Sequence, residues 1–263
     1  MKASLPSRRL ISYLLAALGY GGFFASVGIF VSFFIPLFVA SLPFNRARVA
    51  ILHQVFQSYV VLLALRYLPA LGVYRYRVEG AKPERKPAVY VANHRSRIDG
   101  PLLMAIIPDT GVIMKQAYAR LPLFGFLARF HHFVSVNPSS LDSLARAQKK
   151  CRSLIACGKN MLIFPEGARA RSGRIMPFKD FAFRVAMDAG LPVVPVLIGS
   201  NYPFMAKGTA SIIPYVPNTI TIRFLEDQLP HSAESSSEFA ARIRRLMSKA
   251  IVPLDKNTFW EVE

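Results

Sequence analysis

A long uncharged stretch near the start of the chain limits what it can fold into more than any other feature. No charged residue lies between Arg9 and Arg46, and apolar and aromatic side chains dominate this stretch. About 20 apolar residues in a helix already span the hydrocarbon core of a bilayer. The apolar region of a cleaved signal peptide is shorter, roughly 7–15 residues. The stretch therefore predicts a segment that enters a membrane and stays in the mature protein.

Two membrane arrangements fit this stretch. One is a single tilted span, and the other is a helical hairpin that dips into one leaflet and returns. We favour the hairpin because glycines interrupt the stretch at positions 19, 21, 22 and 28. Basic residues flank both ends, which is typical of ends that stay on the cytoplasmic side. A buried helix pair in a water-soluble protein is disfavoured, because too few polar residues remain to form a wet face.

Residues 49–69 are apolar with scattered polar positions and predict an amphipathic helix on a membrane or on the domain behind it, ended by Pro69. We therefore divide the chain into membrane-associated N-terminal helices (1–70) and a folded domain (71–263). Strand-like and helix-like segments alternate in that domain, which indicates an α/β fold with a mixed, largely buried β-sheet flanked by helices. The expected strands are 73–80, 88–93, 111–115, 132–137, 160–167, 192–200 and 218–226, and the expected helices are 101–107, 123–130, 141–158, 178–190 and 238–254.

The chain is strongly basic, with 33 Lys and Arg against 15 Asp and Glu. Such a charge attracts polyanions, including nucleic acid, anionic lipid headgroups and phosphorylated substrates. Nucleic acid is disfavoured because the basic residues are spread out and no nucleic-acid-binding motif is present. An anionic membrane surface is the expected partner of the positive charge.

The first candidate site follows an apolar run that stops at Asn93-His94, with a carboxylate five residues later at Asp99. Functional groups in open α/β sheets gather beyond the carboxyl ends of strands. A loop that folds back would bring Asp99 onto one imidazole nitrogen of His94 and leave the other free to take a proton from a hydroxyl. The alternative is a helix-capping aspartate beside a surface histidine. No Ser or Cys can be tied to His94, so the hydroxyl would belong to a substrate.

The second candidate site is another apolar strand that breaks into a charged loop, NMLIFPEGARARSG (160–173). Guanidinium groups bind phosphate in a bidentate manner, and a glycine lets the backbone approach a ligand closely. The residues of interest are Glu166, Gly167, Arg169 and Arg171. The alternative is a solvated basic loop. The five histidines and two cysteines show no metal-ligand spacing, so we expect no metal site.

Together these segments resemble the glycerolipid acyltransferase family, whose best-known members are 1-acylglycerol-3-phosphate acyltransferases. Asn93-His94 followed by Asp99 matches the family's NH-x4-D motif, with Ser96 at the usual serine, and residues 164–169 match its FPEGTR motif. Three further matches lie in the family's order between roughly residues 74 and 226: Lys115 with Pro122 and Gly125, Phe178-Lys179, and Val194-Pro195-Val196.

The resemblance implies an α/β fold with a membrane-embedded N-terminal part, with the active site on the cytoplasmic face (of the inner membrane in a bacterium). It implies acyl transfer from acyl-CoA or acyl carrier protein to the hydroxyl of a lysophospholipid, with no cofactor and no acyl-enzyme. By the same analogy His94 is the general base and Asp99 orients it. The implied substrate-binding residues are Asn93, Ser96, Lys115, Glu166, Gly167, Arg169 and Arg171, with Arg169 near the acceptor phosphate.

Two departures from the family pattern leave the acceptor open. The second motif commonly ends in an arginine after a strand, whereas residues 134–138 contain none, and Ala168 stands where threonine is usual. Arg171 or Lys179 would then have to compensate. The first expectation is 1-acylglycerol-3-phosphate, which would give phosphatidic acid. The alternatives are an amino-acid-containing or zwitterionic lysolipid, or a non-catalytic lipid-binding protein of the same fold.

Overall fold

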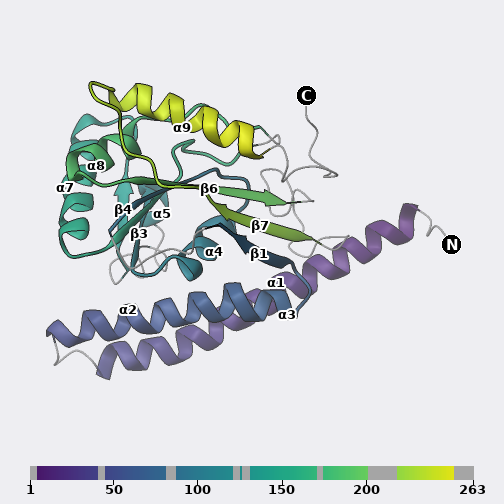
Figure 1. Cartoon of the computed structure of the whole chain (residues 1–263). Helices are drawn as coiled ribbons and strands as arrows, with labels where there is room; N and C mark the ends of the chain where they lie inside the picture. The colour runs from purple at the N-terminus through teal and green to yellow at the C-terminus, as the bar shows by residue number, and fades with distance from the viewer. Residues whose placement is uncertain are drawn as a thin grey trace.

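The computed structural model describes residues 5–40, 45–80, 87–120, 125, 131–170, 174–200 and 218–251 (Figure 1). Its centre is a seven-stranded sheet in the order β1-β7-β6-β2-β5-β3-β4. The strands are β1 (Arg75–Glu79), β2 (Val89–Ala92), β3 (Thr110–Lys115), β4 (Phe133–Val136), β5 (Asn160–Ile163), β6 (Val193–Ser200) and β7 (Thr219–Phe224). The helices are α1 (Leu5–Ala40), α2 (Asn45–Leu62), η1 (Leu63–Tyr67), α3 (Leu68–Ala70), α4 (Asp99–Ile106), α5 (Gln116–Ala119), α7 (Leu141–Ala156), α8 (Phe181–Ala189) and α9 (Ser236–Ile251).

The sheet is mixed, as the sequence predicts. Strands β6, β2, β5, β3 and β4 run parallel, whereas β7 is antiparallel to β6 and parallel to β1. The central strands β2 and β5 are buried throughout, as their apolar sequences require; the one polar residue, Asn160, is hydrogen-bonded through its side chain. The edge strand β1 has no buried residue, and three of its five residues are exposed. The predicted helix at 123–130 lies outside the described residues except for Gly125.

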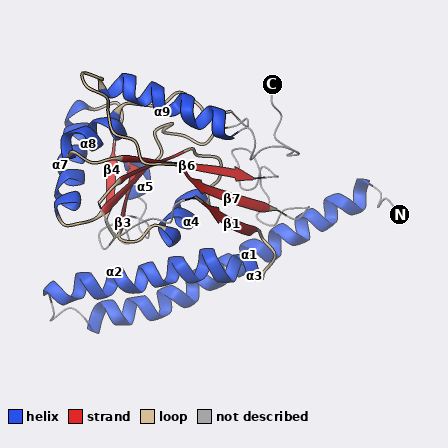
Figure 2. Ribbon diagram, in the orientation of Figure 1, coloured by secondary structure: helices blue, strands red, loops and turns tan. Residues whose placement is uncertain are grey.

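Helices cover both faces of the sheet (Figure 2). Alternate residues of β2 point to opposite faces, so Tyr90 packs in one core with α4 and α2, whereas Val91 packs in a second core with α8 and α9. The helix predicted at 141–158 is α7: the Ser140 side chain caps its N-terminus, and Gly158, in the left-handed region, follows its last turn.

The chain leaves the two central strands toward opposite faces. After β2 it enters α4 on the α2 side of the sheet, and after β5 it proceeds to α8 on the other side. Strand β2 therefore lies at a point where the connections diverge, with β5 on one side and β6 on the other. A crevice beyond the carboxyl ends of the strands is expected at such a point. The loops that follow β2 and β5 meet there.

The turn that we favoured inside the apolar stretch is wrong, because residues 5–40 form one continuous helix, α1. The return comes from α2, which runs antiparallel beside α1 (Figures 1 and 2). Gly22 serves helix packing: the Tyr67 hydroxyl donates to its carbonyl at 3.2 Å, and a Cβ on Gly22 would crowd that hydroxyl. Farther along the same face of α1, Phe30 stacks on Tyr59 of α2, with ring centroids 4.1 Å apart.

The second helical segment ends at Ala70, one residue beyond the Pro69 that the sequence predicts as its end. A π-helical turn, η1, follows α2, and Pro69 lies in the first turn of α3, where a missing N–H is tolerated. Helix α2 packs on α4, and the Gln57 side chain donates to the Met104 carbonyl at 2.7 Å.

The part of the chain that the structure describes contains one helical stretch long and apolar enough to cross a membrane, Ala50–Ala70, and a shorter apolar helix, Phe24–Ala40. Several large apolar side chains of α1 are exposed: Leu14, Leu18, Phe24, Ile29, Phe33, Ile35 and Val39.

Candidate active site

The histidine and the aspartate predicted to pair are in direct contact. His94 Nδ1 lies 2.9 Å from Asp99 Oδ2. The same oxygen accepts hydrogen bonds from the amides of Arg95 and Ser96, both at 2.7 Å. A carboxylate only accepts, so Nδ1 carries the hydrogen and Nε2 of the neutral ring has a free lone pair. This is the arrangement that a general base requires.

The side chains of His94 and Asp99 differ in how far they are buried. Asp99, the first residue of α4, is only 1% exposed, whereas the His94 side chain is 22% exposed. The imidazole also packs on the Phe164 ring, with centroids 4.4 Å apart. The ring is thus oriented from two sides while part of it stays open to a reactant. Phe164 follows β5, so both strand-end loops hold the histidine.

Asn93 fastens the end of β2 to β6. Its Nδ2 donates to the Ile198 carbonyl at 3.0 Å, and its Oδ1 accepts from the Ile198 amide at 2.7 Å. The side chain is 1% exposed. Asn93 thus fixes the place where the loop after β2 leaves the sheet, and its predicted contact with substrate stays a prediction.

Glu166 is buried and turned toward the main chain. Its Oε1 accepts from the His94 amide at 2.7 Å, and its Oε2 accepts from the Met176 amide at 2.9 Å. Burial raises the pKa of the Glu166 carboxyl to about 7, although these two hydrogen bonds act in the opposite direction. The structure thus brings Glu166 to the main chain of His94. The predicted contact of Glu166 with an acceptor stays a prediction.

Cationic and glycine residues surround the loop after β5. Gly167 has φ +67°, and a Cβ there would contact the Lys179 side chain, so the Lys179 amine lies beside this glycine. Arg169 is half-buried in the same loop, and Arg171 lies outside the described residues. Lys115 is exposed at the carboxyl end of β3, and the pairing of Val112 with Leu162 places it at the same sheet edge.

Two buried side chains at the site were not predicted. Arg95 and Ser200 line a small cavity together with the predicted Ser96 and Asp99. Ser200 ends β6, directly beyond the apolar strand that contains Val194-Pro195-Val196, and its place at a strand end was the available signal. Asp99 Oδ1 is buried and makes no hydrogen bond to the described residues. The paired and unpaired carboxylate oxygens of Asp99 therefore have distinct surroundings.

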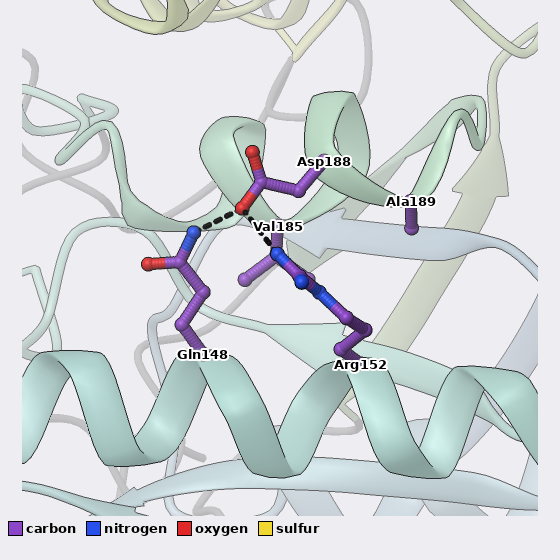
Figure 3. A pocket seen from close by; sticks show the side chains of 5 residues that line it. All are labelled: Gln148, Arg152, Val185, Asp188 and Ala189. Carbon is purple, nitrogen blue, oxygen red and sulfur yellow. Dashed lines mark hydrogen bonds and ion pairs between the residues drawn. The ribbon is translucent and has the colours of Figure 1, made fainter.

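Other polar groupings lie outside these strand-end loops. In a hollow between α7 and α8, Asp188 accepts from Gln148 and pairs with Arg152 at 3.5 Å, which joins the two helices (Figure 3). His131 Nδ1 lies 3.0 Å from His53 Nδ1, and burial lowers the pKa of His131 to about 3. Within the described ranges, no group of three or more His, Cys, Asp or Glu side chains is arranged to hold a metal ion.

Comparison with known proteins agrees with this geometry. An acyltransferase family model matches residues 75–199, which include both strand-end loops. A 1-acyl-sn-glycerol-3-phosphate acyltransferase of Limnanthes douglasii is 30% identical over 151 residues, covering 57% of this chain and 53% of the relative. The chain thus spans about half the length of the curated plant relatives it matches.

A bacterial relative is covered more fully. The 1-acyl-sn-glycerol-3-phosphate acyltransferase of Salmonella typhimurium is 30% identical over 209 residues, covering 73% of this chain and 78% of the relative. The crystal structure of the 1-acyl-sn-glycerophosphate acyltransferase PlsC from Thermotoga maritima superimposes with a TM-score of 0.75 at 23% identity, covering 97% of this chain and 100% of that one. The structural likeness shows a shared fold, and the coverage of the Salmonella enzyme shows that the chain belongs to the family of 1-acyl-sn-glycerol-3-phosphate acyltransferases.

Proposed function

We propose that the protein transfers a fatty acyl group from acyl-CoA or acyl carrier protein to the free hydroxyl of 1-acylglycerol-3-phosphate and so produces phosphatidic acid. The observation that carries this proposal is the contact between His94 and Asp99 at the strand-end crevice. Family membership and the names of the relatives support the substrate assignment.

The reaction follows from the free lone pair on His94. Nε2 takes the proton of the acceptor hydroxyl as its oxygen attacks the thioester carbonyl, and Asp99 stabilises the imidazolium that forms. The tetrahedral intermediate collapses, the C–S bond breaks, and the imidazolium returns the proton to the leaving thiolate. The products are the ester and a free thiol. A positioned base contributes about 10²–10⁴-fold, and orientation of the two substrates contributes more.

Cations of the loop after β5 are proposed to bind the acceptor phosphate. Arg169 and Lys179 flank Gly167 in this loop, and Lys115 projects from the same sheet edge. Guanidinium and ammonium groups are the usual partners of phosphate. Arg171 and Ser96 are retained from the family pattern as further candidates.

Membrane association of the N-terminal helices is part of this proposal. The exposed apolar side chains of α1 and the apolar stretch Ala50–Ala70 support it, because the lysolipid acceptor carries an acyl chain that resides in a bilayer. Each Lys or Arg near an anionic lipid surface contributes roughly 1 kcal/mol to binding. We propose that the crevice faces the cytoplasm, where acyl thioesters are made.

A second acceptor class follows from the end of β4. Relatives with an I-D-R sequence have an arginine after this strand, whereas residues 134–138 of this chain contain none. In that stretch, the Asn137 amide donates to Ser143 Oγ at 2.9 Å and the Asn137 side chain accepts from the Ser139 amide. Asn137 therefore supplies a turn and no cation. A lysolipid with a less anionic headgroup is the alternative acceptor.

The test is product identification. Purified protein in nanodiscs receives isotope-labelled acyl-CoA or acyl carrier protein and a panel of lysolipids, and mass spectrometry identifies the products. We expect labelled phosphatidic acid from the wild type and none from His94→Ala at equal folded concentration. A different labelled phospholipid would move the assignment to the second acceptor class. No thiol release with any acceptor would overturn acyl transfer.

A further inference from the structure

The main chain of His94 is held entirely by the loop after β5. Its amide donates to Glu166 Oε1 at 2.7 Å, and its carbonyl accepts from the Ala170 amide at 2.8 Å. Both backbone groups of the base are therefore bonded to the loop after β5. Any displacement of Glu166 or Ala170 would move His94 relative to Asp99, which belongs to α4.

The second oxygen of Glu166 connects this loop to the segment that precedes α8. Oε2 accepts from the Met176 amide at 2.9 Å, and the Lys179 amide donates to the Pro165 carbonyl at 3.0 Å. Glu166 thus joins two chain segments, one of which contains His94. Because Glu166 is only 7% exposed, water cannot easily replace a lost partner.

A side chain from the last helix in turn fixes the segment that contains Met176. Arg244 of α9 donates from Nε to the Met176 carbonyl at 3.0 Å and from Nη2 to the Ile175 carbonyl at 3.1 Å. A planar guanidinium that holds two consecutive carbonyls restricts both the position and the tilt of a peptide unit. Helix α9 itself packs against β6 and α8.

We propose that Arg244 and Glu166 are positioning residues for His94. Arg244 fixes the position of the Met176 amide. Glu166 accepts hydrogen bonds from that amide and from the His94 amide, and so fixes the main chain of the base. This inference rests on the proposed function, because it takes His94 as the general base. It assigns a catalytic contribution to α9, which supplies no side chain to the His94–Asp99 pair. The raised pKa of Glu166 fits a carboxyl held in a buried place by main-chain donors alone.

The variants that test this network are Arg244→Gln, Arg244→Lys, Glu166→Gln and the double variant Arg244→Gln/Glu166→Gln. Arg245→Gln is the matched control, because Arg245 is the exposed neighbour on α9. In Glu166→Gln the new amide nitrogen faces one of the two N–H donors, so one bond is lost. Arg244→Lys keeps a single donor near the two carbonyls and should retain part of the function.

We expect Arg244→Gln to lower kcat about ten- to a hundredfold, with KM for both substrates unchanged, as for a misplaced catalytic group. The double variant should be no slower than Glu166→Gln alone, since both changes interrupt one chain of contacts. Hydrogen exchange should be faster in the peptides that contain His94 and Met176. Arg245→Gln should match the wild type, and Arg244→Lys should lie between.

Several results would overturn the network: independent effects that multiply in the double variant, a change in acceptor KM alone, or unchanged exchange at the His94 peptide despite lost activity. If Arg244→Gln does not fold, Arg244→Lys carries the same comparisons. If the wild type transfers no acyl group, the proposed function is refuted. Faster hydrogen exchange at the His94 peptide in Arg244→Gln would then still support the network.

Discussion

Replacing Asp99 by asparagine separates the charge of the carboxylate from its geometry. Oδ2 accepts from two main-chain amides as well as from His94, whereas Oδ1 has no partner among the described residues. The two amides require an oxygen, so the asparagine nitrogen takes the place of Oδ1. The carbonyl oxygen still accepts from His94 Nδ1–H. We therefore expect the ring orientation and the tautomer to survive in Asp99→Asn.

What Asp99→Asn loses is the stabilisation of the imidazolium. A hydrogen bond to a charged group contributes about 1.5–3 kcal/mol, against about 0.5–1.5 for a neutral pair. Two unit charges about 4 Å apart at an effective dielectric constant near 20 attract by roughly 4 kcal/mol. We expect a loss of about 2–4 kcal/mol in the transition state, which lowers kcat roughly 30- to 1000-fold. KM should stay unchanged, since the neutral ground state keeps its contacts.

The assay is steady-state thiol release with both substrates varied, beside thermal unfolding of the same preparations. Asp99→Ala is the matched comparison, because it leaves two buried amides unpaired at about 1–3 kcal/mol each and should unfold at a clearly lower temperature. Near-normal kcat in Asp99→Asn would refute the role of the charge. An equal loss of thermal stability in both variants would refute the argument that the amides fix the oxygen.

Three further predictions concern neighbouring residues. Arg169→Ala should raise the acceptor KM about ten- to a hundredfold and leave the donor KM unchanged, because a charged hydrogen bond to the acceptor phosphate is lost. Steady-state kinetics with each substrate varied measures both values, and a change confined to the donor KM would contradict the loop assignment. Asn93→Ala should lower the free energy of unfolding by about 2–5 kcal/mol, since both main-chain groups of Ile198 lose their buried partner, measured as a fall in Tm. Burial raises the pKa of Glu166 from 4.5 to about 7, so the native carboxyl binds its proton more tightly than the unfolded chain does. The free energy of unfolding of the wild type should therefore fall relative to that of Glu166→Gln as the pH rises from about 5 to about 7. The fall should reach up to about 3 kcal/mol, at roughly 1.4 kcal/mol per pKa unit. Parallel plots of unfolding free energy against pH for the two proteins would contradict this.

Sequence reasoning succeeded where a local pattern determines the structure. His94 and Asp99 are five residues apart between a buried strand and a helix start, so a short loop brings their side chains together. Functional groups were expected beyond the carboxyl ends of strands, and β2 and β5, which pair in parallel, end at the same sheet edge.

The missed features depend on contacts between distant segments. Gly22 suggested a turn, but it lies within one continuous helix, α1, where its small size leaves room for the Tyr67 side chain. This contact joins residues 45 positions apart, so the sequence around Gly22 does not reveal it. The hydrogen bonds of Glu166 to the His94 and Met176 amides were not predicted, because motif spacing does not reveal which way a carboxylate turns. Arg244 lies 68 residues from Met176 and in no motif, so no sequence pattern connected the two.

The catalytic loop leaves one position free to vary. From Asn93 to Asp99, every side chain is buried or half-buried except that of Arg97, which projects into solvent between the base and its partner carboxylate. Natural drift or laboratory selection can therefore exchange the charge and size of this one side chain without disturbing the hydrogen bonds on either side. The hydrogen bonds that hold His94 on Asp99 would then be inherited intact whatever side chain stands at position 97.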